Sequence, residues 1–239
     1  MVEIMRIFIT GSSGFIGKEL VEHLSPKHEV VGFAHDEGCD ILNYEQLKSA
    51  MKGCDIVIHL AALRKPYEDK TFKDYFETNC IGTFNVAQAC MENKVKKLIF
   101  TSSMSYYGME KDMPIKVPVV EDSTVLTQRV KTEDLPSTVR DCDVAYSTSK
   151  VIGEQILANY GMRKKFEVII LRLGPTRPKG VYKPFGELKL HLKIENALQA
   201  IENVINTNKK LWYEAFSIVD DIEGVDISKA KKILNYRPV

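Results

Sequence analysis

Apolar residues in the first two thirds of the chain alternate between short continuous runs and longer stretches with helical spacing. A strand that is covered on both faces reads as a near-continuous hydrophobic run. Such runs predict strands at residues 4–10, 29–33, 56–60, 98–101 and 168–173. Apolar positions three and four residues apart predict helices at residues 15–24, 44–51, 72–93 and 146–160. Repeated strand–helix units predict an α/β fold, a Rossmann-type doubly wound parallel sheet with right-handed crossovers.

Two stretches interrupt this alternation. Residues 104–145 form a long, charged connection with three prolines, and a connection of this length in a compact domain is usually functional. The second break, residues 174–186, precedes a predicted helix at 193–206, a short strand at 215–219 and a helix at 228–234. We expect one domain, 1–239, with a small, reduced C-terminal substrate-binding lobe. That lobe is expected to consist mainly of about 174–239 and the 104–145 connection.

Composition narrows the class of protein. The chain is 44% apolar and carries a net charge of +1, which argues against nucleic acid or an anionic membrane as the main partner. Five cysteines without a C-x-x-C pair, and histidines without H-E-x-x-H spacing, predict neither a disulfide framework nor a metal site. No apolar run approaches the ~20 residues of a membrane span. We therefore expect a cytoplasmic protein that acts on a small molecule.

The first predicted strand leads directly into a glycine-rich loop. Gly11 suits a tight turn, Gly14 lets the backbone approach a pyrophosphate, and Gly17 allows close packing of helix on strand. The following helix supplies free N–H groups and the positive end of its dipole. An ordinary glycine-rich turn is the alternative. We predict a dinucleotide site with these members: Gly11, Ser13, Gly14, Phe15, Ile16 and Gly17.

A tyrosine four residues before a lysine is the candidate for proton transfer, because positions i and i+4 share one face of a helix. Lowering the pKa of a phenol from near 10 to near 7 takes roughly 4 kcal/mol of extra phenolate stabilisation, part of which a nearby ammonium supplies. The spacing occurs four times, at Tyr44/Lys48, Tyr107/Lys111, Tyr146/Lys150 and Tyr160/Lys164. Only the 146/150 pair follows a serine-bearing strand end and opens a long helical pattern, so we predict that it is the catalytic pair.

The order of these motifs resembles the extended short-chain dehydrogenase/reductase superfamily, and within it the NAD-dependent epimerase/dehydratase family. Residues 53–62 resemble its G-x-D-x-V-x-H-L-A-A strand, residues 79–83 its N-x-x-G-T helix, and residues 101–108 its S-S…Y-G segment. The resemblance implies that Tyr146 exchanges a proton with a sugar hydroxyl during hydride transfer. It also implies that Lys150 binds the nicotinamide ribose and that Ser103 holds the same substrate oxygen.

The resemblance further implies a set of cofactor contacts beyond the glycine loop and the Tyr146/Lys150 pair. These are Asp40, Ile41, Leu60, Ala61, Ala62, Arg64, Asn79, Ser102, Leu173 and Gly174. An acid usually ends the second strand of an NAD site. Here Ala34 stands at that position and Asp36 follows two residues later. No arginine follows the strand to hold a 2′-phosphate, so we predict NAD, with NADP as the alternative.

Three functions remain open on the sequence. The leading hypothesis is an NAD(P)-dependent epimerase or reductase acting on a sugar, in particular a nucleotide sugar. Its diphosphate could be bound by Arg172, Arg177, Lys179 and Lys183, for which solvated surface charge is the alternative. A free sugar or uronate dehydrogenase is the second hypothesis, because the chain is shorter than typical family members. A non-catalytic NAD(P)-binding regulatory protein is the third. The resemblance also implies a homodimer through the helices at 72–93 and 146–160.

Overall fold

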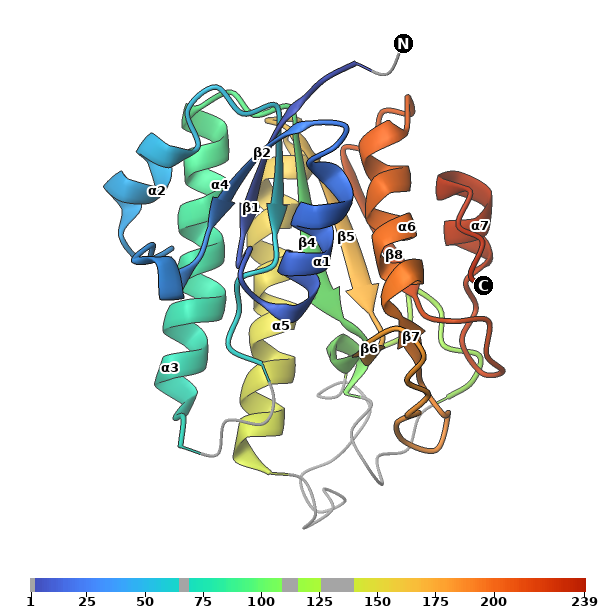
Figure 1. The fold of residues 1–239 in the computed structure, drawn as a ribbon. Coiled ribbons are helices and arrows are strands. Elements are labelled where there is room, and N and C mark those ends of the chain that lie inside the picture. The colour runs from blue at the N-terminus through green and yellow to red at the C-terminus, as the bar shows by residue number, and fades with distance from the viewer. Residues whose placement is uncertain (1–2, 65–68, 109–115, 126–139) are drawn as a thin grey trace.

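The computed structural model describes residues 3–64, 69–108, 116–125 and 140–239. Within these ranges a six-stranded parallel sheet with strand order β2-β1-β3-β4-β5-β8 forms the centre of the molecule (Figure 1). The predicted α/β fold with a doubly wound parallel sheet is thus confirmed. The strands are β1 (Arg6–Thr10), β2 (Glu29–Phe33), β3 (Ile56–His59), β4 (Lys97–Ser103), β5 (Glu167–Leu173) and β8 (Tyr213–Ile218).

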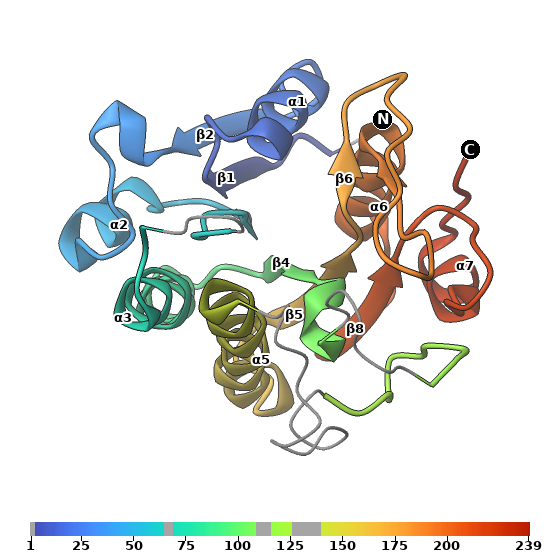
Figure 2. The same cartoon turned by 90° about the horizontal axis from the view of Figure 1, so that it is seen from below.

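Helices cover both faces of the sheet (Figure 2). One face carries α1 (Phe15–Leu24), α6 (Ile194–Asn206) and α7 (Ser228–Leu234). The other carries α2 (Tyr44–Ala50), α3 (Phe72–Phe76), the π-helical turn η2 (Glu77–Ile81), α4 (Gly82–Glu92) and α5 (Asp141–Met162). Each face buries its own apolar cluster, because parallel strands present hydrophobic side chains on both sides. The strand order reverses between β1 and β3, which opens a crevice at their carboxyl ends.

Among the element boundaries that differ from the prediction, three bear on the site. The helix expected at 146–160 begins at Asp141, because the Asp143 carboxylate accepts hydrogen bonds from the backbone N–H and the guanidinium of Arg140 and so caps an earlier turn. The helix expected at 72–93 is divided into α3 and α4 by the π-helical turn. The fourth strand continues two residues further, to Ser103. Tyr146 therefore lies in the second turn of α5 instead of at its start.

The two stretches that interrupt the alternation contain short ordered elements. The first holds the 3-10 helix η3 (Met104–Tyr107) and a bridge between Val119 and Val225, while 109–115 and 126–139 lie outside the described residues. The second forms a small parallel pair, β6 (Thr176–Arg177) with β7 (Leu192–Lys193). Since β8 joins the main sheet and α6 covers it, both belong to the Rossmann-type layers. The substrate lobe itself stays a prediction.

Two surface properties bear on the expected partners. The outer side of the α3–α4 layer exposes apolar side chains: Phe72, Ile81, Phe84 and Met91. This is the layer through which the homodimer is predicted, and the homodimer remains a prediction. Among the helices of the described ranges, none is both long enough and apolar enough to cross a membrane.

A buried histidine connects the sheet to the helical layer behind it. The Nδ1 atom of His59 lies 2.7 Å from the Thr10 hydroxyl, and its Nε2 atom lies 3.0 Å from the Thr83 hydroxyl. Thr83 donates its own proton to the carbonyl of Asn79, and the N–H of Ala61 donates to Thr10. His59 is therefore assigned as neutral, with its proton on Nε2 and Thr10 donating to Nδ1.

This histidine predicts a specific acid sensitivity. Burial, with a smaller contribution from the Lys150 ammonium, lowers the pKa of His59 from 6.5 to about 3. Between these two values the unfolded chain binds a proton that the folded chain does not, so the free energy of unfolding falls as the pH decreases. The contribution is about 1.4 kcal/mol per pH unit. Urea unfolding of the native protein and of His59→Gln at pH 7, 6, 5 and 4 should show a shallower slope for the variant. Identical slopes would contradict the assignment.

Candidate functional site

The glycine loop lies where β1 meets α1, at the edge of the crevice. Gly11 has a φ of +71°, and a Cβ atom there would lie 2.8 Å from the backbone nitrogen of Ala61. A Cβ atom at Gly17 would lie 2.2 Å from the carbonyl oxygen of Gly11. Side chains are thus excluded at both positions by backbone atoms. Because α1 begins at Phe15, the free N–H groups of its first turn are available to an anion in the crevice.

A cleft of about 700 Å³ extends from this loop along the carboxyl ends of the strands. Most of the predicted cofactor residues line it: Gly11, Ser13, Gly14, Phe15, Ile16, Gly17, Asp36, Asp40, Ile41, Leu60, Ala61, Ala62 and Arg64. Other lining residues were not predicted, among them Phe33, His35, Cys39, Leu42, Leu63, Lys70, Asp74, Glu77, Thr78 and Thr101. The cleft has the narrow loop, the small wall residues and the helix N-terminus that a dinucleotide requires.

Asp36, which stands two residues beyond the usual position of the acid in an NAD site, contacts the glycine loop. Asp36 lies in the short 3-10 helix η1 (His35–Glu37) that follows β2, and the hydroxyl of Ser13 donates a hydrogen bond to its carboxylate. This contact places a negative charge beside the loop although Ala34 occupies the position directly after the strand. A carboxylate at this end of the cleft is the group that accepts hydrogen bonds from ribose hydroxyls in an NAD site.

Lys150 contacts the wall of the cleft but, like Tyr146 and Ser103, is not among its lining residues. Its side chain is only 4% exposed, and its Nζ atom donates a 2.9 Å hydrogen bond to the carbonyl of Thr101, which lines the cleft. The ammonium also lies 4.9 Å from the ring centre of Phe100 and 5.7 Å from that of Tyr146. Tyr146 and Lys150 thus share one face of α5, as their spacing predicted.

The protonation of Lys150 reflects two opposing effects. Burial lowers the pKa of Lys150 to about 8, while the Glu154 carboxylate and, to a smaller extent, the Cys80 thiol act to raise it. Burial also raises the pKa of Cys80 to about 11, so this thiol is neutral at pH 7. Lys150 is consequently still mainly an ammonium at neutral pH, although its pKa of about 8 lies only slightly above that pH.

Ser103 ends β4 at the same edge of the sheet. Its hydroxyl oxygen accepts a 3.1 Å hydrogen bond from the backbone N–H of Ser105 and so begins η3, which packs against α5. Ser103 lies on β4 and the Tyr146/Lys150 pair lies on α5, a helix that packs against β4 and η3 and whose Lys150 contacts Thr101 of the same strand. Their catalytic roles remain a proposal.

Asn79 is a connector between the cleft wall and α5. Its Oδ1 atom accepts from the N–H of Leu63 at 2.7 Å, and its Nδ2 atom donates to the Leu63 carbonyl at 2.9 Å and to the Ser149 hydroxyl at 2.8 Å. The side chain is buried in the π-helical turn η2 and is not among the lining residues of the cleft. It therefore fixes the position of the wall that follows β3.

The remaining predicted residues lie close to the cleft without lining it. The Ser102 hydroxyl points away from the cleft and donates a 2.6 Å hydrogen bond to Glu154. Leu173 is part of the buried core, and a Cβ atom at Gly174 would lie 2.9 Å from the side chain of Val219. Among the described residues, no group of three or more histidine, cysteine or acidic side chains could hold a metal ion.

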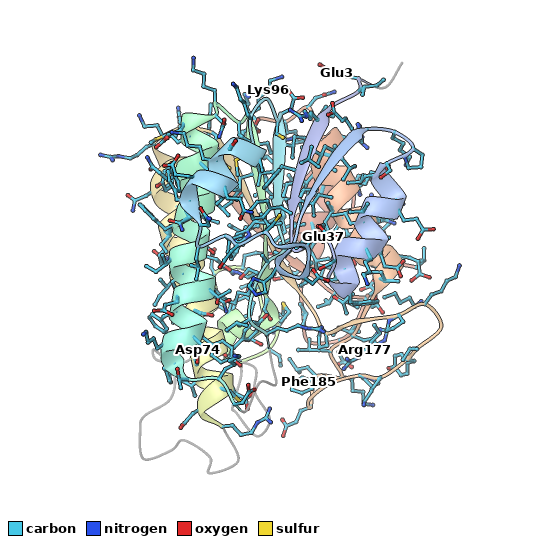
Figure 3. The ribbon with its side chains drawn as sticks, turned by 60° about the vertical axis from the view of Figure 1, so that its left-hand side comes forward. Glu3, Glu37, Asp74, Lys96, Arg177 and Phe185 are labelled. Carbon is cyan, nitrogen blue, oxygen red and sulfur yellow. The ribbon has the colours of Figure 1, made fainter. Side chains whose placement is uncertain are left out.

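The prediction that Arg172 binds a substrate diphosphate is wrong. This arginine is 4% exposed, and its guanidinium donates to both carboxylate oxygens of Glu154 and to the Tyr107 hydroxyl. Arg177, in contrast, is half-buried, donates a 3.0 Å hydrogen bond to the carbonyl of Lys183, and lies on the same side of the molecule as Phe185 (Figure 3). Lys179 and Lys183 are exposed between them along the chain.

Known proteins with similar sequences include dehydrogenases, an epimerase and a dehydratase. The L-arabinose 1-dehydrogenase (NAD(P)(+)) of Haloferax volcanii is 32% identical over 176 residues, which are 71% of this chain and 66% of that protein. The UDP-glucose 4-epimerase of Vibrio cholerae is 26% identical over 261 residues, covering 95% of this chain and 73% of that protein. The chain spans less than two thirds of the length of the arabinose dehydrogenase.

A solved structure supports the fold, and a family match covers nearly the whole chain. The UDP-glucuronic acid 4-epimerase from Bacillus cereus, in complex with UDP-glucuronic acid and NAD, has a TM-score of 0.74 at 22% identity and covers 98% of this chain and 94% of its own. Residues 7–227 match the NAD dependent epimerase/dehydratase family. This chain belongs to the NAD-dependent epimerase/dehydratase family of the extended short-chain dehydrogenase/reductase superfamily.

Proposed function

We propose that the protein is an NAD-dependent oxidoreductase or epimerase that transfers hydride at a carbinol carbon of a sugar. The observation that carries the proposal is the position of Lys150: its buried ammonium lies 5.7 Å from the ring centre of Tyr146 and donates to the carbonyl of Thr101, a residue that lines the glycine-loop cleft. A phenol, an ammonium and a strand-end serine next to a dinucleotide cleft are the groups of an acid–base site for a hydroxyl group.

In this proposal each of the three residues has a separate task. The Lys150 ammonium stabilises the phenolate of Tyr146 in a site where the charge is poorly screened. Tyr146 then removes the proton from the sugar hydroxyl, or returns it in the reverse direction, and the Ser103 hydroxyl holds that oxygen in place. NAD, when bound, supplies the carbon that accepts or returns the hydride. The glycine loop and the first turn of α1 would bind its pyrophosphate.

The substrate class follows from the cations that remain available. The leading candidate is a nucleotide sugar, whose diphosphate would be bound by Arg177, Lys179 and Lys183, which lie outside the lining of the glycine-loop cleft. One observation favours a free sugar or sugar acid instead. Arg172 forms a buried ion pair with Glu154 and therefore cannot bind an anionic substrate. The 32% identical relative acts on L-arabinose by its name, which agrees with this second candidate.

The first prediction from the proposed function tests the catalytic pair. Tyr146→Phe should lower turnover at least about 100-fold, because the proton acceptor is lost, while binding of NAD measured by calorimetry stays nearly unchanged. The matched control is Tyr160→Phe, which removes the phenol of another tyrosine four residues before a lysine, near the end of the same helix. Its turnover should remain close to native. Native turnover in Tyr146→Phe would refute the catalytic assignment.

The second prediction concerns the choice of cofactor. With Asp36 beside Ser13, NAD should bind more tightly than NADP, whose 2′-phosphate would face the carboxylate. Asp36→Asn should weaken NAD binding by about tenfold and reduce the preference, since a charge-assisted hydrogen bond is lost. Side-by-side calorimetric titration of both cofactors measures this. Glu37→Gln, a neighbouring exposed acid outside the cleft lining, is the control, and equal affinity of the native protein for both cofactors would contradict the role of Asp36.

The third prediction separates the candidate substrates. Nucleotide sugars, free sugars and sugar acids are incubated with the protein and NAD, and absorbance of the reduced nicotinamide is followed together with product analysis. Net reduction with a free sugar identifies a dehydrogenase, whereas a changed sugar without net reduction identifies an epimerase. For a nucleotide sugar, Arg177→Gln should raise KM more than it lowers kcat. Binding of NAD without conversion of any sugar would favour the regulatory alternative.

A further inference from the structure

Glu154 is a fully buried carboxylate to which the proposed reaction gives no task. It accepts hydrogen bonds from the Ser102 hydroxyl at 2.6 Å and from the Arg172 guanidinium at 2.7 and 3.0 Å. In sequence it follows Lys150 by four residues and Tyr146 by eight, within the unbroken helix α5. The three side chains therefore stand in one row on the same face of that helix.

Arg172 holds this carboxylate through a second set of contacts. Its guanidinium lies 3.6 Å from the ring centre of Tyr106, and it donates to the Tyr107 hydroxyl and to the carbonyl of Glu121, each at 2.7 Å. The Glu121 side chain in turn accepts from the N–H of Ser217 on β8. The guanidinium is thus fixed by η3 and by the 104–145 connection, and the Glu154 carboxylate has little freedom to move.

Stability alone is a poor explanation for such a pair. Removing two charges from water costs several kcal/mol for each ion, and well-packed apolar residues of similar size often stabilise a protein equally well. What an apolar pair could not do is act on the charge of a neighbour. That neighbour is Lys150, one helical turn away, whose ammonium is buried and is opposed by its own desolvation.

We propose that Glu154 is a positioning residue for the catalytic pair, which keeps Lys150 in its charged form while Arg172 fixes the carboxylate at the required place. The inference rests on the proposed function of Tyr146 and Lys150. It adds a residue that touches neither substrate nor cofactor and acts only through Lys150.

Apart from the Arg172 guanidinium, the ionisable groups that face Lys150 and Glu154 are neutral at pH 7. Facing Lys150, the thiol of Cys80 and the imidazole of His59 carry no charge, because burial raises the pKa of the thiol to about 11 and lowers that of the imidazole to about 3. Facing Glu154, burial raises the pKa of the phenols of Tyr106 and Tyr213. The attraction between the Glu154 carboxylate and the Lys150 ammonium is consequently the main interaction that opposes the effect of burial on the Lys150 charge.

Two substitutions at Glu154 distinguish a charge role from a packing role. Glu154→Gln keeps the size and removes the charge, whereas Glu154→Asp keeps the charge and shortens the side chain by one methylene. The titration of Lys150 is followed by NMR of lysine carrying carbon-13 at Cε, in the protein without substrate, and the Lys150 signal is assigned by its loss in Lys150→Arg. Glu154→Gln should lower the midpoint by about one to two pH units, and Glu154→Asp should retain most of the native value.

A packing role predicts the opposite ranking, with the isosteric Gln variant nearly native and the Asp variant more disturbed. An unchanged Lys150 midpoint in Glu154→Gln would overturn the proposal. Glu22→Gln, which removes a carboxylate from the exposed side of α1, is the control and should leave the midpoint unchanged. If Glu154→Gln does not fold, Arg172→Gln tests the same proposal, with the Lys150 midpoint expected to change in the opposite direction. Loss of the cation that neutralises Glu154 should raise the midpoint, and an unchanged or lowered value would contradict the proposal.

The same measurement keeps the two proposals separate. The Lys150 titration is read in the resting protein, so it does not depend on which sugar is the substrate or on turnover. If Tyr146→Phe retains turnover, the proposed function fails whatever the Glu154 variants show. If Tyr146→Phe is inactive and the Lys150 midpoint is the same in Glu154→Gln, only the role of Glu154 fails. The alkaline limb of the kcat/KM profile should move to lower pH in Glu154→Gln in parallel with the midpoint.

Discussion

A single ammonium buried at the carboxyl edge of the sheet is the constraint around which this structure is arranged. Removing the Lys150 charge from water costs several kcal/mol before compensation. The compensation comes from three elements: the Thr101 carbonyl of β4, the aromatic rings of Phe100 and Tyr146, and the Glu154 carboxylate one turn further along α5. Each must be in place together, because any one alone would leave the charge under-stabilised.

The hydrogen bonds behind the cleft keep this arrangement in register with the cofactor site. Asn79 joins the wall after β3 to α5 through Leu63 and Ser149, and His59 joins that wall to the end of β1 and to α4. The glycine loop, the cleft wall and α5 are thus connected by side chains that are themselves buried. A displacement of one would leave polar groups unsatisfied in the others, which costs more than the hydrogen bonds contribute.

Much of the fold and part of the site could be predicted from the sequence because they depend on local patterns. Continuous apolar runs gave the strands, and the glycine spacing after the first run gave the cofactor loop. The start of α5 at Asp141 was missed, since it depends on how Asp143 contacts Arg140 in an otherwise polar segment. The Glu154–Arg172 pair was also missed, because an ion pair between a helix and a strand leaves no local pattern.

Glu154 nevertheless had a recognisable feature in the sequence, namely its continuation of the Tyr146–Lys150 spacing by one more turn. That spacing predicts a base and its cation, and Glu154 occupies a third position on the same helix face. Arg172 shows the opposite case. A cation at the end of a predicted strand suggested a bound anion, but its partner is the protein's own Glu154 carboxylate.

Because Arg172 is paired with Glu154, the residues proposed for proton transfer are distinct from those left to select the substrate. The residues proposed for proton transfer lie on the central strands and α5, where buried contacts hold them. Of the cations left for an anionic substrate, Arg177 ends β6, and Lys179 and Lys183 lie in the segment between β6 and β7. The ring of His191 holds this segment, with Nδ1 2.6 Å from the Asp220 carboxylate and Nε2 3.1 Å from the Val181 carbonyl. Under the proposed function, changes in this segment would alter which substrate is bound without disturbing the buried contacts of Lys150 and Glu154.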